Sequence, residues 1–320
     1  MEYIKRGPTH FDVTFAITPL VSKMMESSLT YNSHGEEVTL AYQLHGSGDT
    51  KLLMISGMNT NGSIWKHLIP YLKNYTICTF DLRGTGSSSV PSNYSVNIFA
   101  EDAIAVVDRL KWNKFNICGI SMGGMTCLKL VQKCPERITS QTLMSTALQG
   151  LGVESWTATI LLFYATLIAI IHRQWRFYFI LPLLFPMKHL RSRHADGRRY
   201  WRHVIDNVRS DFGGDKKPPL RSTMGHMKAV TMYKIPETEI KAIKLLDIPS
   251  VVIGGNKDIL VRPKFTSRVA AKLAYPLHIL DGVGHAPIAQ EGIPERLADI
   301  MMTHIGDLNV RSYSPVQIDE

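Results

Sequence analysis

Short apolar runs that alternate with segments of helical spacing constrain the fold of this chain more than any other feature. The runs, bounded by turn residues, are Val38–Gln43, Lys51–Ser56, Tyr75–Phe80, Phe115–Ile120, Thr142–Ser145, Pro249–Gly254 and Leu277–Leu280. Helical spacing is found at Phe99–Leu110, Met125–Val131, Phe265–Leu273 and Glu291–Met302. Buried strands that alternate with helices predict an α/β fold, with a doubly wound, mostly parallel sheet covered on both faces.

One segment interrupts this alternation and carries the charge of the chain. Residues 147–235 hold 14 Lys and Arg against 5 Asp and Glu, which is a net charge of +9, and the remaining residues are neutral overall. We therefore predict an N-terminal arm (1–35), an α/β core (36–146 and 236–305), an apolar and basic helical insertion (147–235) and a C-terminal tail (306–320). A hydrophobic content of 45% is enough for a substantial packed core and excludes a disordered chain.

The composition of the insertion leaves two interpretations open. Residues 155–171 contain no charged side chain, residues 177–187 are again apolar, and a basic run follows, formed by Lys188, Arg191, Arg193, Arg198, Arg199 and Arg202. Aromatic and apolar stretches beside clustered arginines are typical of an element lying in an anionic membrane surface. The pattern equally fits two buried helices beside a solvated basic helix, because 155–171 reaches only the lower limit of about 17–25 residues for a spanning helix.

A candidate nucleophile lies between a predicted strand and a predicted helix. Gly119-Ile120-Ser121-Met122-Gly123 fits the pattern G-x-S-x-G, in which a tight turn exposes the serine at the carboxyl end of a sheet. A serine hydroxyl is a poor nucleophile until a neighbouring base takes its proton. The chain must therefore supply a histidine and a group that orients it.

Two residues that come much later in the chain meet this requirement. Asp258 follows the predicted strand that ends near Gly254, and His285 lies in a glycine-rich loop after the next strand. Residues at the carboxyl ends of parallel strands share one edge of the sheet, which is where ligands bind. We therefore predict a catalytic triad of Ser121, Asp258 and His285.

A single membrane crossing at 155–171 would place Ser121 on one side of the membrane and Asp258 and His285 on the other, so such a crossing is disfavoured.

With these motifs in place, the chain resembles the α/β-hydrolase fold superfamily over about residues 36–305. Asp81-Leu82-Arg83-Gly84-Thr85-Gly86-Ser87 is similar to a family turn, and Gly57-Met58-Asn59 to the family's oxyanion loop. The resemblance implies a serine hydrolase with an inserted cap, whose oxyanion hole is formed by the backbone N–H groups of Met122 and Met58. The family loop usually begins His-Gly, whereas this one begins Ser56-Gly57. Asp81 and Arg83 are predicted to be structural, with the guanidinium bonded to loop carbonyls.

The predicted activity is hydrolysis of a carboxylic ester through an acyl-enzyme on Ser121, with a lipid-like or hydrophobic acyl substrate. The alternatives are a soluble esterase, a thioesterase or a C–C bond hydrolase acting on a small molecule, and a non-catalytic ligand receptor of the same fold. Such chemistry requires no metal or organic cofactor, and His189, His194 and His203 show no zinc-ligand pattern. The oligomeric state is left open.

The expected partners and location follow from the same features. No nucleic-acid-binding motif accompanies the basic insertion, so no nucleic-acid partner is predicted. The start of the chain has no apolar leader, and four cysteines in 320 residues are not a disulfide scaffold. These features predict a cytoplasmic protein with reduced core thiols, and the membrane interpretation of the insertion adds peripheral attachment to an intracellular anionic surface.

Overall fold

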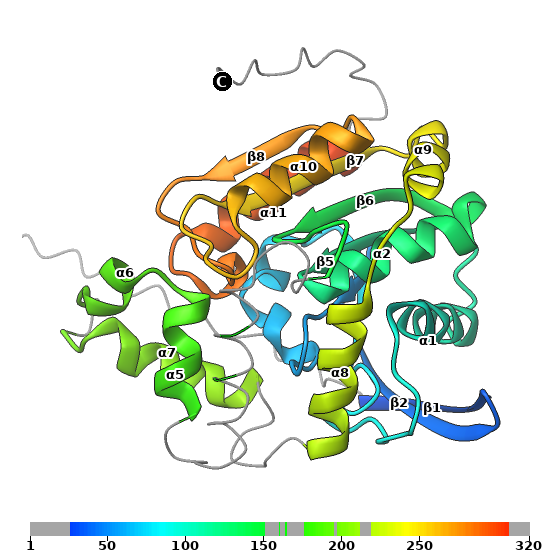
Figure 1. Ribbon diagram of the computed structural model, residues 1–320, viewed down its shortest axis with the longest axis horizontal. Helices are drawn as coiled ribbons and strands as arrows, with labels where there is room; N and C mark the ends of the chain where they lie inside the picture. The colour runs from blue at the N-terminus through cyan, green and yellow to red at the C-terminus, as the bar shows by residue number, and fades with distance from the viewer. Residues whose placement is uncertain are drawn as a thin grey trace, which may run out of the picture.

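A central sheet with helices on both sides forms the core of the computed structural model (Figure 1). The structure describes residues 26–150, 160, 164, 176–194, 197–211 and 219–306. The described strands are β1 (Glu26–Ser33), β2 (Glu36–His45), β3 (Thr50–Ile55), β4 (Tyr75–Phe80), β5 (Phe115–Ile120), β6 (Ile138–Met144), β7 (Ser250–Gly255) and β8 (Leu277–Leu280). Their order is β1-β2-β4-β3-β5-β6-β7-β8, and the strands from β4 to β8 are parallel, whereas β1 and β2 are antiparallel. The predicted fold class is confirmed.

Helices follow most of the strands. The described helices are α1 (Val96–Arg109), α2 (Met122–Lys133), α5 (Arg176–Leu184), α6 (Met187–Arg191), α7 (Tyr200–Asp211), α8 (Leu220–Met232), α9 (Glu237–Leu245), α10 (Pro263–Leu273) and α11 (Ile293–Gly306). Short 3-10 turns lie at η1 (Gly62–His67), η2 (Ile69–Tyr71), η3 (Pro135–Arg137) and η4 (Pro287–Ala289).

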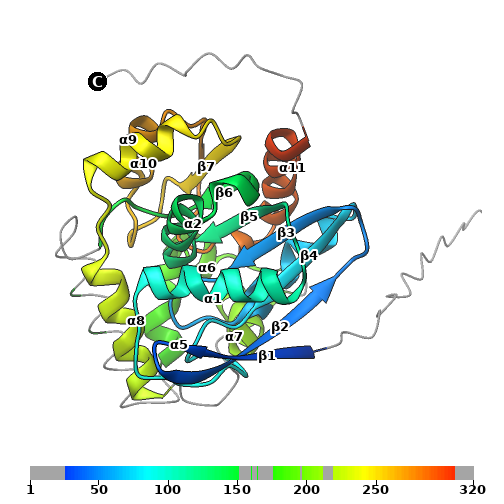
Figure 2. The same ribbon diagram turned by 90° about the vertical axis from the view of Figure 1, so that its right-hand side faces the viewer.

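The strands bury both faces, and alternate residues reach opposite sides of the sheet. In β3, Leu53 and Ile55 join the apolar cluster under α1, α2, α9 and α10, whereas Leu52 and Met54 join the cluster under η1, η2 and α11. Figure 2 shows α9 and α10 on one side of the sheet and α11 on the other. This two-sided burial explains why the strands appear in the sequence as continuous apolar runs.

The prediction of an arm over residues 1–35 is wrong for its last ten residues. β1 pairs with β2 along its whole length, and the two strands are joined at His34 and Gly35, which both have positive φ angles (54° and 79°). Only Leu29 and Tyr31 pack against the core from this strand, so its apolar signal is weak. The rest of the proposed arm and the tail after Gly306 lie outside the described residues.

The described part of residues 147–235 forms helices beside the carboxyl edge of the sheet. α5, α6 and α7 lie together on the side to which the arrowheads of β6 and β8 point (Figure 1). The uncharged stretch 155–171 is outside the described residues except for Ile160 and Tyr164. Among the helices that are described, none combines the length and the apolar content needed to cross a membrane.

The four cysteines are all buried free thiols, namely Cys78, Cys118, Cys127 and Cys134.

Candidate active site

Ser121 lies on a strained turn between β5 and α2. Its backbone angles are φ 55° and ψ −119°, which non-glycine residues rarely adopt. The turn needs its glycines, because a Cβ at Gly119 would lie 2.3 Å from the Gly123 carbonyl oxygen and a Cβ at Gly123 would lie 2.0 Å from that of Ile55. The local sequence thus forces a strand directly into a helix and leaves Ser121 partly exposed.

Hydrogen bonds hold this strained backbone in place. The Ser121 N–H donates to the Met144 carbonyl over 2.8 Å, which continues the pairing of β5 with β6. The Thr146 hydroxyl donates to the Ser121 carbonyl over 2.8 Å, and the Gly124 N–H donates to the same oxygen over 3.0 Å. The position of the candidate nucleophile is therefore set by the ends of two neighbouring strands.

Asp258 and His285 form a buried hydrogen-bonded pair. The Asp258 side chain is brought there by the turn after β7, where one carboxylate oxygen accepts the N–H groups of Leu260 and Val261, each over 2.9 Å. The other oxygen lies 2.8 Å from His285 Nδ1. The two residues are 3% and 7% exposed. Because the carboxylate accepts the Nδ1 proton, the neutral imidazole presents Nε2 as a base.

All three residues lie at the same edge of the sheet. Ser121 directly follows β5, Asp258 is three residues beyond β7, and His285 is five residues beyond β8. These strands are parallel members of the order β5-β6-β7-β8, so their carboxyl ends face the same side. Within the described residues, the structure joins Asp258 to His285 by a hydrogen bond, and it has no such bond between Ser121 and His285.

The loop after β3 lies against the candidate nucleophile. A Cβ built at Gly57 would be 3.5 Å from the Ser121 Cβ, so the loop backbone is in contact with this residue. The Gly57 carbonyl accepts the Thr60 N–H over 3.4 Å and the Thr60 hydroxyl over 3.0 Å, which closes a turn over Met58 and Asn59. Met122, at the start of α2, is fully buried. Of the two residues predicted to supply oxyanion N–H groups, Met122 directly follows Ser121 in the chain, and Met58 directly follows Gly57, which is in contact with Ser121.

Asp81 is a turn acid, as predicted. Its carboxylate accepts the N–H groups of Gly62 and Ser87, each over 2.8 Å. A Cβ at Gly86 would lie 1.8 Å from this carboxylate, so the turn requires glycine there. Asp81 therefore joins the loop after β3 to the turn that contains Arg83.

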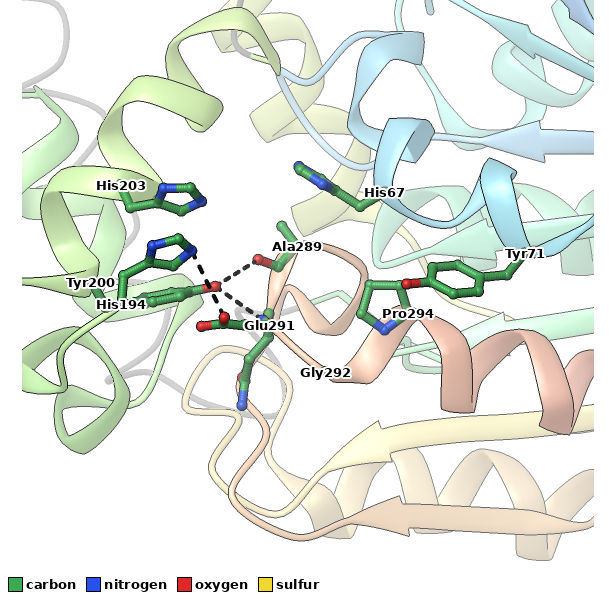
Figure 3. A pocket seen from close by; sticks show the side chains of 10 residues that line it. His67, Tyr71, His194, Tyr200, His203, Ala289, Glu291, Gly292 and Pro294 are labelled. Carbon is green, nitrogen blue, oxygen red and sulfur yellow. Dashed lines mark hydrogen bonds and ion pairs between the residues drawn. The ribbon is translucent and has the colours of Figure 1, made fainter. Parts of the chain in front are cut away.

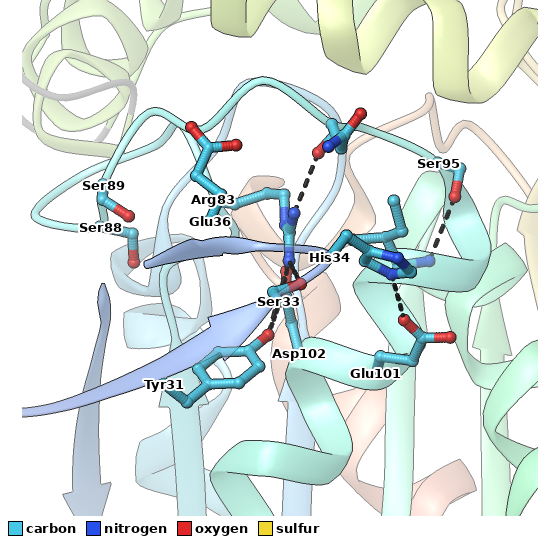
Figure 4. A network of polar contacts seen from close by, with 12 residues as sticks. Tyr31, Ser33, His34, Glu36, Arg83, Ser88, Ser89, Ser95, Glu101 and Asp102 are labelled. Carbon is cyan, nitrogen blue, oxygen red and sulfur yellow. Dashed lines mark hydrogen bonds and ion pairs between the residues drawn. The ribbon is translucent and has the colours of Figure 1, made fainter. Parts of the chain in front are cut away.

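The prediction for Arg83 is incomplete. Besides a loop carbonyl, the guanidinium binds the carboxylate of Asp102: Nε donates to it over 2.7 Å, and both side chains are fully buried. The guanidinium also donates to the Ser33 hydroxyl (2.9 Å) and to the Asn93 carbonyl (3.0 Å), as Figure 4 shows in part. A buried carboxylate is needed because an unpaired guanidinium in the core would be strongly destabilising. The Tyr31 hydroxyl donates to the same carboxylate, and burial raises the pKa of Tyr31.

Comparison with known proteins identifies this architecture. Residues 51–291 match the sequence profile of the alpha/beta hydrolase fold family. The chain belongs to this family. A 3-oxoadipate enol-lactonase from Acinetobacter baylyi is 34% identical over 126 residues, which are 38% of this hydrolase-fold chain and 47% of the relative. The chain thus spans about half the length of the first curated relatives it matches.

Solved structures of the same fold cover more of this alpha/beta hydrolase. The enol-lactonase from Burkholderia xenovorans LB400 has a TM-score of 0.70 at 20% identity and covers 87% of this chain and 100% of its own. A thermophilic esterase from Thermogutta terrifontis has a TM-score of 0.71 at 20% identity, and the match covers 89% of this chain and 100% of the esterase. At these identities the structures show the fold, and the curated relatives support a hydrolase.

Helix α5 is joined to the loops that carry Asp258 and His285. Leu183 packs against Leu260, which follows Asp258 by two residues. The Ala286 N–H, next to His285, donates to the Leu184 carbonyl over 3.1 Å. The sequence pattern did not predict these contacts, because short apolar helices are typical of any buried segment.

A cavity of about 200 Å³ lies between the helices of residues 147–235, here called the helical segment, and the α/β core (Figure 3). It is lined by His67 of η1, by His194 and His203 and by Glu291, and the two rings of His194 and His203 stack at 3.9 Å. The Glu291 N–H donates to the Tyr200 hydroxyl over 2.9 Å at its wall. Among the described residues, no group of three or more His, Cys, Asp or Glu side chains is suited to hold a metal ion.

Helix α8 supplies two buried polar residues that the sequence reasoning missed. The Ser222 hydroxyl donates to the Gly84 carbonyl over 2.6 Å, and His226 lies between the Arg83 carbonyl and the Asn59 N–H. Their spacing of four residues puts both side chains on one helix face. The available signal was this spacing of a serine and a histidine, which places both on one face of the predicted helix.

Proposed function

We propose that this chain hydrolyses a carboxylic ester through an acyl-enzyme on Ser121. The observation that carries the proposal is the buried hydrogen bond between Asp258 and His285. It leaves His285 Nε2 free to act as a base at the sheet edge that also holds the strained Ser121. A nucleophile, a base and a group that orients the base are the parts that acyl transfer requires.

The first half of the proposed reaction forms the acyl-enzyme. Ser121 Oγ attacks the ester carbonyl carbon while His285 Nε2 accepts the hydroxyl proton, and Asp258 remains ionised beside the imidazolium. The carbonyl electron pair moves onto oxygen, and we assign the backbone N–H groups of Met58 and Met122 to this oxyanion. One such donor is worth about 3–4 kcal/mol of transition-state stabilisation. The intermediate then expels the alcohol, which takes its proton from His285.

The second half of the reaction regenerates the serine. His285 accepts a proton from a water molecule as the water oxygen attacks the acyl carbon. The new intermediate breaks its bond to Ser121 Oγ, which recovers its proton from His285, and the carboxylic acid leaves.

We propose that the preferred substrate is an ester with a hydrophobic acyl group. The support is α5, whose end packs on the loops of Asp258 and His285 and which carries exposed Tyr178 (49%) and Phe179 (46%). A compact lactone is the second candidate, because the curated relatives include proteins named 3-oxoadipate enol-lactonase. An enol-lactone is itself an ester, so the same three residues serve both candidates.

The test combines covalent labelling with a substrate series. A fluorophosphonate probe should label the wild type but not S121A or H285A, and S87A, at an exposed serine, should label normally. The wild type should hydrolyse p-nitrophenyl esters with turnover that rises from acetate toward longer chains. A rate that falls along the series while an enol-lactone is hydrolysed would favour the lactone. Labelling of S121A, or no labelling of folded wild type, would contradict the acyl-enzyme and favour the receptor alternative.

We also propose that the helical segment caps the site and meets an anionic membrane surface. Tyr178 of α5 lies 5.6 Å from the Trp201 ring of α7, and the Arg202 guanidinium lies 5.3 Å from that ring. The basic side chains around them are exposed, namely Lys188, Arg191, Arg193, Arg198, Arg199 and Arg202. Buried Leu181 and Phe185 belong to the packing of the segment on the core, so the interface in this proposal is the exposed aromatic and basic side.

A further inference from the structure

The imidazole of His226 bridges two loops at the candidate active site. It lies on α8, is fully buried, and is 143 residues from one partner and 167 from the other. Nδ1 lies 3.1 Å from the Asn59 backbone nitrogen, and Nε2 lies 2.8 Å from the Arg83 carbonyl oxygen. Asn59 directly follows Met58, so the bridge reaches the loop to which one oxyanion donor was assigned.

The two partners allow only one protonation state of this ring. A backbone N–H can only donate, so Nδ1 must be an unprotonated acceptor toward Asn59. A carbonyl can only accept, so Nε2 must carry the proton that His226 donates to Arg83. A doubly protonated ring would direct an N–H against the Asn59 N–H. The neutral Nε2–H tautomer is therefore built into the structure, and burial lowers the pKa of His226 to about 4.

The surroundings of His226 keep the ring in a fixed orientation. The rings of Tyr94 and Phe99 lie 5.6 Å and 5.2 Å from it. The backbone partner on the other side is fixed too, because the Arg83 guanidinium is anchored on the buried Asp102. The Asn59 N–H is thus tied to a rigid part of the core.

The loop has bonds of its own, from Thr60 to the Gly57 carbonyl, but the partner of the Asn59 N–H is His226. Asn59 has a positive φ of 56°, which is uncommon for a non-glycine residue, although asparagine adopts it more readily than most. Ser56 stands where the resembling loops have a histidine, and its hydroxyl reaches only the Asn61 carbonyl within the same loop (3.0 Å). Fixing the Asn59 N–H fixes the plane of the Met58–Asn59 peptide and so restrains the Met58 Cα from that side. The bonds from Thr60 to the Gly57 carbonyl restrain the Gly57–Met58 peptide, which carries the Met58 N–H.

We infer that His226 is a positioning residue for the oxyanion loop, which holds the Met58 backbone in place from a helix outside the α/β core. The inference rests on the proposed function, in which the Met58 N–H faces the oxyanion. His226 touches neither substrate nor reacting atoms in this scheme. Its effect therefore appears in kcat and in the binding of transition-state analogues, with KM little changed.

Substitutions at His226 separate the two hydrogen bonds. H226N keeps an oxygen acceptor near the position of Nδ1, H226Q keeps a donor near the position of Nε2, and H226F keeps neither. The matched control is S222A, which removes the bond from the same helix to the Gly84 carbonyl and leaves Asn59 untouched. Thermal unfolding of each variant establishes that it is folded, and if H226F is not, the comparison of H226N with H226Q decides.

With p-nitrophenyl esters, H226F and H226Q should lose about 10- to 100-fold in kcat, a part of the ~100- to 1,000-fold seen when an oxyanion donor is removed outright. H226N should recover most of the loss, and S222A should stay within a few-fold of wild type. A boronic acid inhibitor should bind the H226Q variant about tenfold more weakly, at unchanged KM. Equal kcat in H226N and H226Q, or an equal loss in S222A, would overturn the inference.

A measurement that does not need turnover distinguishes this inference from the proposed function. The Asn59 amide should be protected from hydrogen exchange in the wild type and in H226N, and it should exchange much faster in H226Q. Nitrogen chemical shifts should show the Nε2–H tautomer of His226. An absence of wild-type turnover contradicts the proposed function, whereas unchanged Asn59 exchange in H226Q contradicts the positioning role.

Discussion

At the residue scale, the conformation of Ser121 is the most informative single feature of the candidate site. A φ of 55° with a ψ of −119° costs an L-residue about 1–3 kcal/mol. The pairing of its N–H with Met144 and of its carbonyl with Thr146 maintains that conformation. Such strain is expected where a side chain must point out of a strand-to-helix turn toward a substrate.

A comparison of two substitutions isolates this strain. S121G and S121A both lack the hydroxyl, so both should lose turnover. S121G should be more stable by about 1 kcal/mol, because the relief of backbone strain exceeds the 0.5–1 kcal/mol entropic cost of glycine. Urea unfolding of both variants measures the difference. At the exposed Ser87, which has no positive φ, the order should reverse, and S121A matching or exceeding S121G in stability would rule out the strain.

At the element scale, one of the hydrogen bonds that join α8 to the core, from the Asn59 N–H to His226 Nδ1, exists only when the ring is neutral. The ring faces the Asn59 amide, the Arg83 carbonyl, and the rings of Tyr94 and Phe99. Burial lowers its pKa to about 4, and the positive charge of Arg83 adds to the shift. An unfolded histidine titrates near 6.5, so the unfolded chain binds this proton at a higher pH than the folded chain does.

The stability of the protein should therefore fall as the pH drops from about 6.5 toward 4. The shift of roughly 2.5 units at 1.36 kcal/mol per unit predicts a loss of about 3 kcal/mol from His226 by pH 4. H226N does not titrate in this range, so its unfolding free energy in urea should fall about 3 kcal/mol less than that of the wild type between pH 7 and pH 4. Parallel curves for the two proteins would show that His226 takes up its proton equally in both states.

At the scale of the whole molecule, the charge is concentrated in one segment. Residues 147–235 carry the entire net charge of +9, and six of their basic side chains are exposed on and beside α6 and α7. A lysine or arginine near an anionic bilayer contributes about 1 kcal/mol to binding. The neutral remainder of the chain gives no comparable attraction, so any membrane contact is expected to be oriented.

This distribution predicts selective binding to anionic vesicles. The wild type should sediment with phosphatidylserine-containing vesicles at low salt, but not with phosphatidylcholine vesicles or at high salt. R198Q/R199Q/R202Q should bind about 100-fold more weakly, since three charges of about 1 kcal/mol each are lost. The control K73Q/K241Q/K244Q removes three exposed lysines outside residues 147–235 and should have little effect on vesicle binding. Failure of the wild type to sediment, or an equal loss in both triple variants, would exclude the proposed surface.

The central strands could be predicted from local patterns. Tyr75–Phe80 and Phe115–Ile120 coincide with β4 and β5, because buried parallel strands are largely apolar, and Leu277–Leu280 coincides with β8 at the edge of the sheet. The antiparallel β1 escaped detection, since it has only two core-facing apolar side chains. The Ser121 turn was equally local, because two glycines and a serine are what so tight a strand-to-helix connection requires.

Residue type and local spacing were therefore enough to predict the α/β fold, the turn at Ser121 and the order of Ser121, Asp258 and His285. The contacts that support these features arise only when the chain is folded. The Arg83 guanidinium pairs with Asp102 as well as with the Asn93 carbonyl, and His226 bonds to partners 143 and 167 residues away. A buried polar group bonds to whichever partner the folded chain brings within about 3 Å, and that distance is set by the packing of α8 on the loops and not by any local pattern.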